Sequence, residues 1–371
     1  MDDIVNRRLL QYWLERVSQI IVLEPNNNPY SFPILEYITK SCALVRIIQS
    51  VSARHEQYSS AQASVIALEE RGKALESFRG EMDRLETTPQ ASLLTAMLLG
   101  LSHGANDDMA DFGKQHLFAA RILIGKLLQH TSNLLEYDSL SRLCCGMYIY
   151  WDMCTSFLVD PDEEQEFNSL DLSIAVRRMG RWHHPMYGYC TELLFILADV
   201  GRYSRQVLHS PPNPTREASL EQQLLNCDAC SANSSLERLY GAFRKHGLIF
   251  LYRTSGSNGL FTNTDLEEFS LEALIHHYAV ETVHLLLEIP MASNHLNFQS
   301  LPLLTAGSEL KSTDSGLRGH VLQRLRAMYS LNRLPANLHV ARLLENCGAY
   351  RTTAIRLSGY ITCCKKDGDC F

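Results

Sequence analysis

The chain has 371 residues, of which 46% are hydrophobic and 20% charged, and its formal net charge is −7. This length allows one large or two ordinary hydrophobic cores, and the composition is that of a folded protein rather than a disordered one. The negative charge argues against nucleic acid as the default partner, because binding to phosphates depends on an excess of lysine and arginine. The basic clusters at residues 177–181 and 365–366 are too short to change this expectation.

The sequence also argues against a membrane protein or an exported one. Its best apolar run, residues 93–101, is about half the ~18 residues that a membrane span needs. The start, Met1-Asp2-Asp3, is acidic where a secretory signal or a transit peptide would be basic. We therefore expect a soluble protein of the cytosol or the nucleus.

Eleven cysteines are scattered through the chain, an odd number without the regular spacing of a disulfide framework. In an intracellular protein these thiols are expected to be reduced. Cys144, Cys145 and Cys154 lie among large apolar and aromatic residues, where cysteine behaves as a small hydrophobic side chain.

Apolar residues recur at intervals of three and four from the start of the chain. Leu9, Trp13 and Val17 open the pattern, which stops at the turn-forming residues 24–29. Thr88 and Pro89 form a helix start, with a capping hydroxyl before a first-turn proline. Helices are predicted in this first part at residues 9–21, 41–58, 61–85, 88–101, 111–130 and 137–158.

Two breaks divide the rest of the chain. Residues 160–166 form a mostly acidic segment, which predicts a solvated loop. Residues 209–214 include three prolines, which predict a linker. Helices are predicted around these breaks at residues 187–206, 218–226, 235–252, 265–288, 316–331 and 337–346.

The fold class that follows is all-α, a large irregular helical domain with a possible division into two helical subdomains near residues 207–216. No segment alternates apolar and polar residues long enough to predict a strand, and no fixed period indicates a solenoid. The predicted core contains Trp13, residues 42–52, Leu98, Leu123 and Trp151, since each lies on an apolar helical face.

Three groups of residues could carry chemistry, and each has a structural alternative. Cys227 and Cys230 have the spacing of half a zinc site without a second pair, and the trio of cysteines at 363, 364 and 370 lies in a polar tail. A second group could form a metal or acid/base stripe, although a solvated helix face explains it as well. Its members are His277, Glu281, His284 and Glu288.

The third group is Trp182-His183-His184-Pro185, with Asp152 as a carboxylate that could orient a histidine. Packing histidines at a capped helix start are the structural alternative. The sequence has no nucleophile elbow, phosphate loop, dinucleotide fingerprint or metalloprotease motif. We therefore assign no catalytic, cofactor-binding, metal-binding or DNA-binding residue and expect no cofactor.

Four blocks occur in a recognisable order and approximate spacing, at residues 42–55, 94–103, 116–124 and 302–309. Together they resemble the fungal-specific transcription factor domain, the helical regulatory domain usually found after a Zn₂Cys₆ DNA-binding cluster. The resemblance spans residues 9–345, and residues 324–345 resemble that domain's closing helices. Residues 346–350 depart from the acidic, tryptophan-bearing ending common in the family, and residues 363–371 resemble nothing in it, so residues 346–371 are treated as a divergent tail.

The family's zinc cluster needs six cysteines in a short basic segment, and no cysteine precedes Cys42. The resemblance therefore implies a nuclear transcriptional regulator that acts through protein contacts or ligand sensing. A DNA-binding partner and a small-molecule effector are expected, without specific DNA binding by this chain, and control of a secondary-metabolite gene cluster fits the family. The alternative is a helical enzyme or small-molecule-binding protein of a biosynthetic pathway that has reused the domain.

Overall fold

The computed structural model describes residues 4–56, 61–84, 88–103, 113–129, 139–159, 170–180, 182–227, 231–255 and 271–347. Within these residues every regular element is a helix, and the only β interaction is an isolated bridge between His184 and Gly188. The all-α fold class is confirmed. No described helix is long and apolar enough to cross a bilayer.

The chain divides into two compact units, each described by itself. The first comprises residues 1–149 and 166–188, and the second residues 150–165 and 189–371. Residues 207–216 lie inside the second unit, so the boundary that we predict there stays a prediction.

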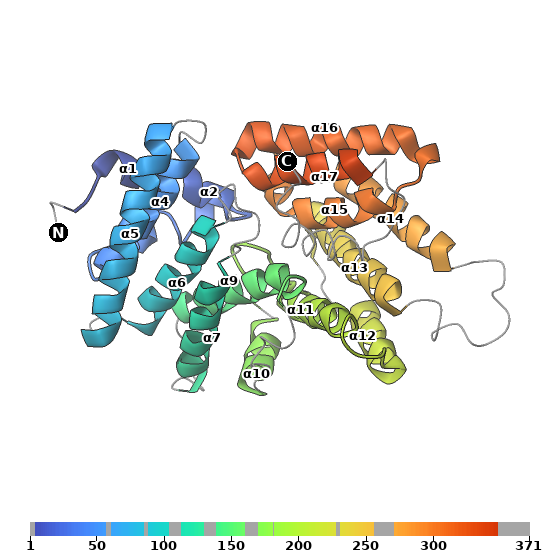
Figure 1. Ribbon diagram of the computed structural model, residues 1–371, viewed down its shortest axis with the longest axis horizontal. Helices are drawn as coiled ribbons and strands as arrows, with labels where there is room; N and C mark the ends of the chain where they lie inside the picture. The colour runs from blue at the N-terminus through green and yellow to red at the C-terminus, as the bar shows by residue number, and fades with distance from the viewer. Residues whose placement is uncertain are drawn as a thin grey trace. The chain divides into compact units, whose positions relative to one another are not determined.

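The first unit is built around helix α4. It packs against α5 along most of its length and also contacts α1 and α6 (Figure 1). The helices of this unit are α1 (Arg7–Tyr12), a π-helical turn (Trp13–Val17), α2 (Ser18–Ile20), α3 (Leu35–Ile38), α4 (Cys42–Glu56), α5 (Ala61–Arg84), α6 (Pro89–His103), α7 (Lys114–Gln129), the first part of α9 (Ser139–Ser156) and α10 (Leu170–Met179), with 3-10 turns at Pro25–Asn27 and Phe32–Ile34.

Helix ends in this unit follow the predicted local signals. The Thr88 hydroxyl accepts a hydrogen bond from the Ala91 amide at 3.3 Å, as an N-cap should. The start of α4 is capped locally by the Ser41 hydroxyl, which accepts from the Leu44 amide at 3.1 Å. The buried Glu81 carboxylate of α5 adds a second cap, because it accepts from the Ala43 amide at 2.9 Å and from the Ser41 hydroxyl at 2.8 Å. A carboxylate at this end of the helix also complements the helix dipole.

The second unit centres on α13, which packs against α11, α12, α14 and α15. Its closing helices α16 and α17 pack against each other (Figure 1). The helices after α9 are α11 (Thr191–Gln206), α12 (Pro214–Asn226), α13 (Ser234–Ser255), α14 (Leu271–Leu287), α15 (Ser300–Glu309), α16 (Ser315–Asn332) and α17 (Pro335–Cys347), with 3-10 turns at Asn294–Phe298 and Ser312–Asp314.

The proline-rich break ends in a helix start. Asn213 caps α12 by accepting from the Arg216 amide at 3.1 Å, and Pro214 occupies the first turn. The buried Glu217 carboxylate accepts the Tyr203 hydroxyl at 2.6 Å, and that hydroxyl accepts from the Asn213 amide at 2.8 Å. These bonds fix the end of α11 to the start of α12.

Three helices are missing from the sequence prediction, the short α3 and the longer α10 and α15. In α10 apolar residues lie on both the buried and the exposed face, so the 3.6-residue period is obscured. Helix α15 contains Pro302 and Gly307, both poor helix formers. Gly307 packs closely on α17: a Cβ at this position would lie 2.8 Å from a methyl group of Leu344, which would have to shift.

The predicted core positions are confirmed. Trp13 is 1% exposed and its indole donates to the Tyr30 carbonyl at 2.7 Å, while Leu98, Leu123 and Trp151 are also buried. Most of the 42–52 segment is buried as well; Arg46 is among its partly exposed residues.

Candidate functional site

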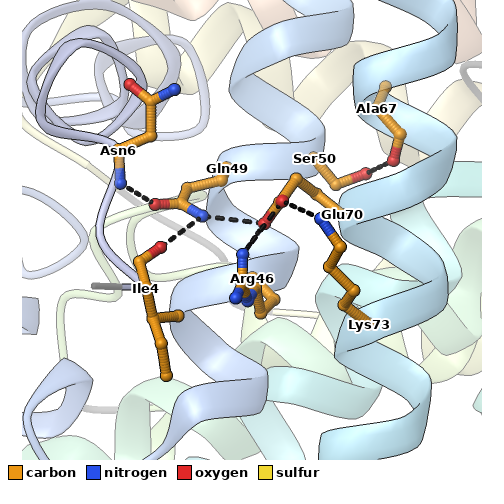
Figure 2. Close-up of polar contacts among 8 residues, drawn as sticks. All are labelled: Ile4, Asn6, Arg46, Gln49, Ser50, Ala67, Glu70 and Lys73. Carbon is orange, nitrogen blue, oxygen red and sulfur yellow. Dashed lines mark hydrogen bonds and ion pairs between the residues drawn. The ribbon is translucent and has the colours of Figure 1, made fainter. Parts of the chain in front are cut away.

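The candidate site lies where α4, α5 and the segment before α1 meet in the first unit. Small residues allow α4 and α5 to approach closely, and the Ser50 hydroxyl donates to the Ala67 carbonyl at 2.7 Å across the contact (Figure 2). Ala53, Ala67 and Leu9 form a buried cluster, with Ile66 packed against it. The backbones of the two helices are therefore held in a fixed register beside the site.

Glu70 is the centre of the polar contacts at this site. Arg46 Nη1 donates to both carboxylate oxygens at 2.9 Å, Lys73 Nζ lies 3.1 Å from Oε1, and Gln49 Nε2 donates to Oε2 at 2.8 Å (Figure 2). Burial raises the pKa of Glu70, but the hydrogen bonds from Arg46 and Lys73 outweigh it, so the net shift of the pKa is downward. The carboxylate is therefore ionised and shared between two cations.

Gln49 connects this ionic group to the segment before α1. Its side chain is 1% exposed. The Gln49 oxygen accepts from the Asn6 amide, and its nitrogen also donates to the Ile4 carbonyl at 3.3 Å (Figure 2). Both ends of the buried amide are thus satisfied, and residues 4–6 are fixed on α4 by backbone contacts.

A pocket of about 260 Å³ opens between these elements. One side is polar and the other is apolar, so the pocket suits a ligand with both characters. It is lined by Ile4, Val5, Asn6, Leu9, Arg46, Gln49, Ile66 and Glu70.

The histidine group identified in the sequence is structural. His184 is fully buried, and its Nδ1 accepts from the Met186 amide at 3.1 Å, so Nε2 carries the proton and donates to the Leu143 carbonyl at 3.1 Å. Burial lowers the pKa of His184 to about 3, which keeps the ring neutral. A Cβ at Gly146 would lie 2.3 Å from this ring, so the ring packs directly on a glycine.

These residues form a turn before α11, not the predicted helix start. The His184 and Gly188 backbones bond to each other, and α11 begins only at Thr191. His183 lies 3.5 Å from Glu24.

Asp152, in the second unit, pairs with an arginine. It is 2% exposed and forms an ion pair with Arg202, which also lies 3.5 Å from Asp199. This ion pair connects the end of α9 with α11.

The predicted solvated face of α14 is confirmed. His277, His284 and Glu288 are exposed, and Glu281 lies 3.6 Å from His277 and 3.5 Å from Lys245. His277, Glu281 and Glu288 make surface ion pairs, and in the described part of the chain the four residues do not form a metal-holding group.

Cysteines in the described part of the chain are free thiols. Burial raises the pKa of Cys145 and of Cys154 to about 12, in keeping with the prediction of hydrophobic packing. Cys230 and the cysteines at 363, 364 and 370 lie outside the described residues. Within the described ranges no group of three or more His, Cys, Asp or Glu side chains is arranged around a common metal position.

Sequence reasoning missed Arg46, Gln49 and Glu70. Arg46 and Gln49 interrupt the apolar pattern of α4 at positions three residues apart, on one helical face. That interruption is the one available signal, and it does not reveal the partner on α5.

Comparison with known proteins identifies the family. The family model of the fungal specific transcription factor domain matches residues 8–366 and so extends past Glu345 into the segment treated above as a tail. No curated protein and no solved structure matches the chain. Because the family model covers nearly the whole chain, this protein belongs to the family defined by the fungal-specific transcription factor domain.

Proposed function

We propose that this chain regulates transcription in the nucleus by contacting a partner protein, and that a small molecule controls this contact. The observation that carries the proposal is the family match over residues 8–366. The pocket beside Arg46 supports the second half of it, because a partly apolar cavity with a few fixed polar groups is the usual form of a small-molecule site.

The partner is a DNA-binding transcription factor or a component of the transcription machinery. The net charge of −7 disfavours phosphate contacts by these residues, so a partner protein brings the chain to promoters. The target genes that we propose are those of a secondary-metabolite cluster.

Deletion of the gene with transcript profiling tests this function. A coordinated change in the transcripts of a set of neighbouring genes is expected. Unchanged transcripts together with an accumulated pathway intermediate would overturn the proposal and favour the alternative, an enzyme or small-molecule-binding protein of a biosynthetic pathway. The pocket is compatible with that alternative, which is why the transcripts decide between the two.

A further inference from the structure

Arg46 has hydrogen-bond donors that the protein does not use. A guanidinium carries five N–H groups in a planar fork. Only Nη1 of Arg46 is bonded, to Glu70, and in the described part of the chain neither Nε nor Nη2 makes a hydrogen bond. The side chain is 20% exposed and lines the pocket, so these donors are accessible to a ligand there.

The charges at this end of the pocket favour an anion. Glu70 is the acidic residue among the lining residues, and its single carboxylate is shared by Arg46, which also lines the pocket, and by the half-exposed Lys73, which does not. Glu70 therefore neutralises Arg46 only in part, in a partly buried position where electrostatic attraction exceeds that at an open surface. The unused donors of Arg46 suit an anionic group of a ligand.

The other end of the pocket is apolar. Ile4, Val5, Leu9 and Ile66 line it, and Leu9 and Ile66 belong to the buried cluster between α1, α4 and α5. The pocket is small, with a volume of about 260 Å³, and it opens to solvent. This space accommodates a short hydrocarbon tail, whose transfer from water is favourable in proportion to its buried area.

We propose that this pocket binds a small amphiphilic monocarboxylate, and that this ligand is the effector of the regulator, an inference that rests on the proposed function. The carboxylate accepts two parallel hydrogen bonds from Nε and Nη2 of Arg46, an arrangement that matches the guanidinium fork. The tail packs against Leu9 and Ile66. A phosphate would place two charges near Glu70 and leave the apolar end unfilled, so a monocarboxylate fits better.

Occupation of the pocket stabilises the N-terminal segment on α4 and α5. Ile4, Val5 and Asn6 form one wall, and they are fixed to α4 by the hydrogen bonds of Ile4 and Asn6 with Gln49. A ligand that touches both walls binds the closed arrangement better than an open one, which is the requirement for an effector that shifts a conformational equilibrium.

The experiment measures binding of hexanoate to the full purified chain by calorimetry, together with hydrogen exchange of residues 4–12. Hexanol and hexylammonium serve as probes of equal length without the negative charge. We expect hexanoate to bind and to slow exchange in residues 4–12, and the two other probes to do neither. Equal binding of hexanol or hexylammonium would overturn the inference, as would no binding of hexanoate.

Two variants test the two ends of the pocket. Arg46→Gln should weaken hexanoate binding at least about tenfold, since it removes a charge-assisted pair. Ile66→Trp should also abolish binding by filling the apolar end, while it leaves Arg46 and Glu70 in place. Arg177→Gln, at an exposed arginine of α10, is the matched control and should bind as the unmodified chain does.

Circular dichroism establishes that each variant is folded. If Arg46→Gln does not fold, Ile66→Trp alone tests the site. If either variant folds and still binds hexanoate with wild-type affinity, the proposed site is refuted. Transcript profiling separates this inference from the proposed function. Normal regulation without hexanoate binding would reject the ligand class and keep the function, whereas binding without any change of transcripts on gene deletion would reject the function and keep the site.

Discussion

His246 should make the second unit sensitive to mild acid. Its ring is fully buried, its Nδ1 lies 2.8 Å from the Thr305 hydroxyl, and among the described residues its Nε2 has no hydrogen-bond partner. The rings of Phe157 and Phe250 lie against it, with centroids at 5.4 and 5.1 Å. Burial lowers the pKa of His246 from 6.5 to about 3, because a charged imidazole here would lose its hydration without gaining a partner.

The sign and size of the effect follow from proton linkage. The unfolded chain binds a proton at this histidine below pH 6.5 and the folded chain does not, so stability is complete above pH 6.5 and falls as the pH drops toward 3. A pH of 5 is about 1.5 units below the pKa of a histidine in the unfolded chain, and each pH unit corresponds to about 1.4 kcal/mol. The second unit should therefore lose about 2 kcal/mol of unfolding free energy between pH 7.5 and pH 5.

Urea denaturation followed by circular dichroism at pH 7.5 and pH 5 measures this loss. His246→Gln can keep the Thr305 contact and cannot titrate, so its loss between the two pH values should be smaller by about 2 kcal/mol. His277→Gln, at an exposed histidine of α14, is the matched control and should behave as the unmodified chain. An undiminished loss in His246→Gln would refute the reasoning.

Four further results are expected. Trp13→Ala should lower the unfolding free energy by about 3 to 5 kcal/mol, because it empties a fully buried site; an unchanged melting temperature would contradict this. Glu309→Gln should lower the unfolding free energy by about 3 kcal/mol, because it leaves the partly buried Arg253 without its buried partner. Glu272→Gln, which removes the exposed partner of Arg253, should lower it by less than about 1 kcal/mol in the same denaturation assay. Elemental analysis should find no stoichiometric zinc, and one or two zinc ions per chain would overturn that expectation. A mobility-shift titration at about 0.15 M salt should show no sequence-dependent retardation of promoter fragments by the chain alone.

The closing helices illustrate which structural features the local sequence pattern predicts in this chain. Helices α16 and α17 match their predicted ranges within a few residues, because a hydrophobic period of 3.6 residues can be detected within one continuous segment of sequence. The Thr88 cap and the burial of Trp13 were predictable for the same reason. The family resemblance also came from such local blocks.

The sequence could not supply the partners of the polar side chains. Residues 182–185 formed the densest group of titratable and aromatic residues in the sequence, and Asp152 was a carboxylate that could orient a histidine. The structure gives His184 backbone partners and pairs Asp152 with Arg202. Helix α15 forms despite Pro302 and Gly307, and it packs on α17, where a Cβ at Gly307 would lie 2.8 Å from a methyl group of Leu344.

The candidate site shows most clearly what tertiary structure decided. Arg46 and Gln49 were visible as polar residues on an apolar helix, but Glu70 lies on the next helix and Ile4 precedes α1. Helical periodicity depends on residues three and four apart, whereas an ion pair and a pocket wall depend on which helices meet. The packing of whole apolar faces decides which helices meet, so the sequence by itself determined most of the helices, and the tertiary structure determined the pocket.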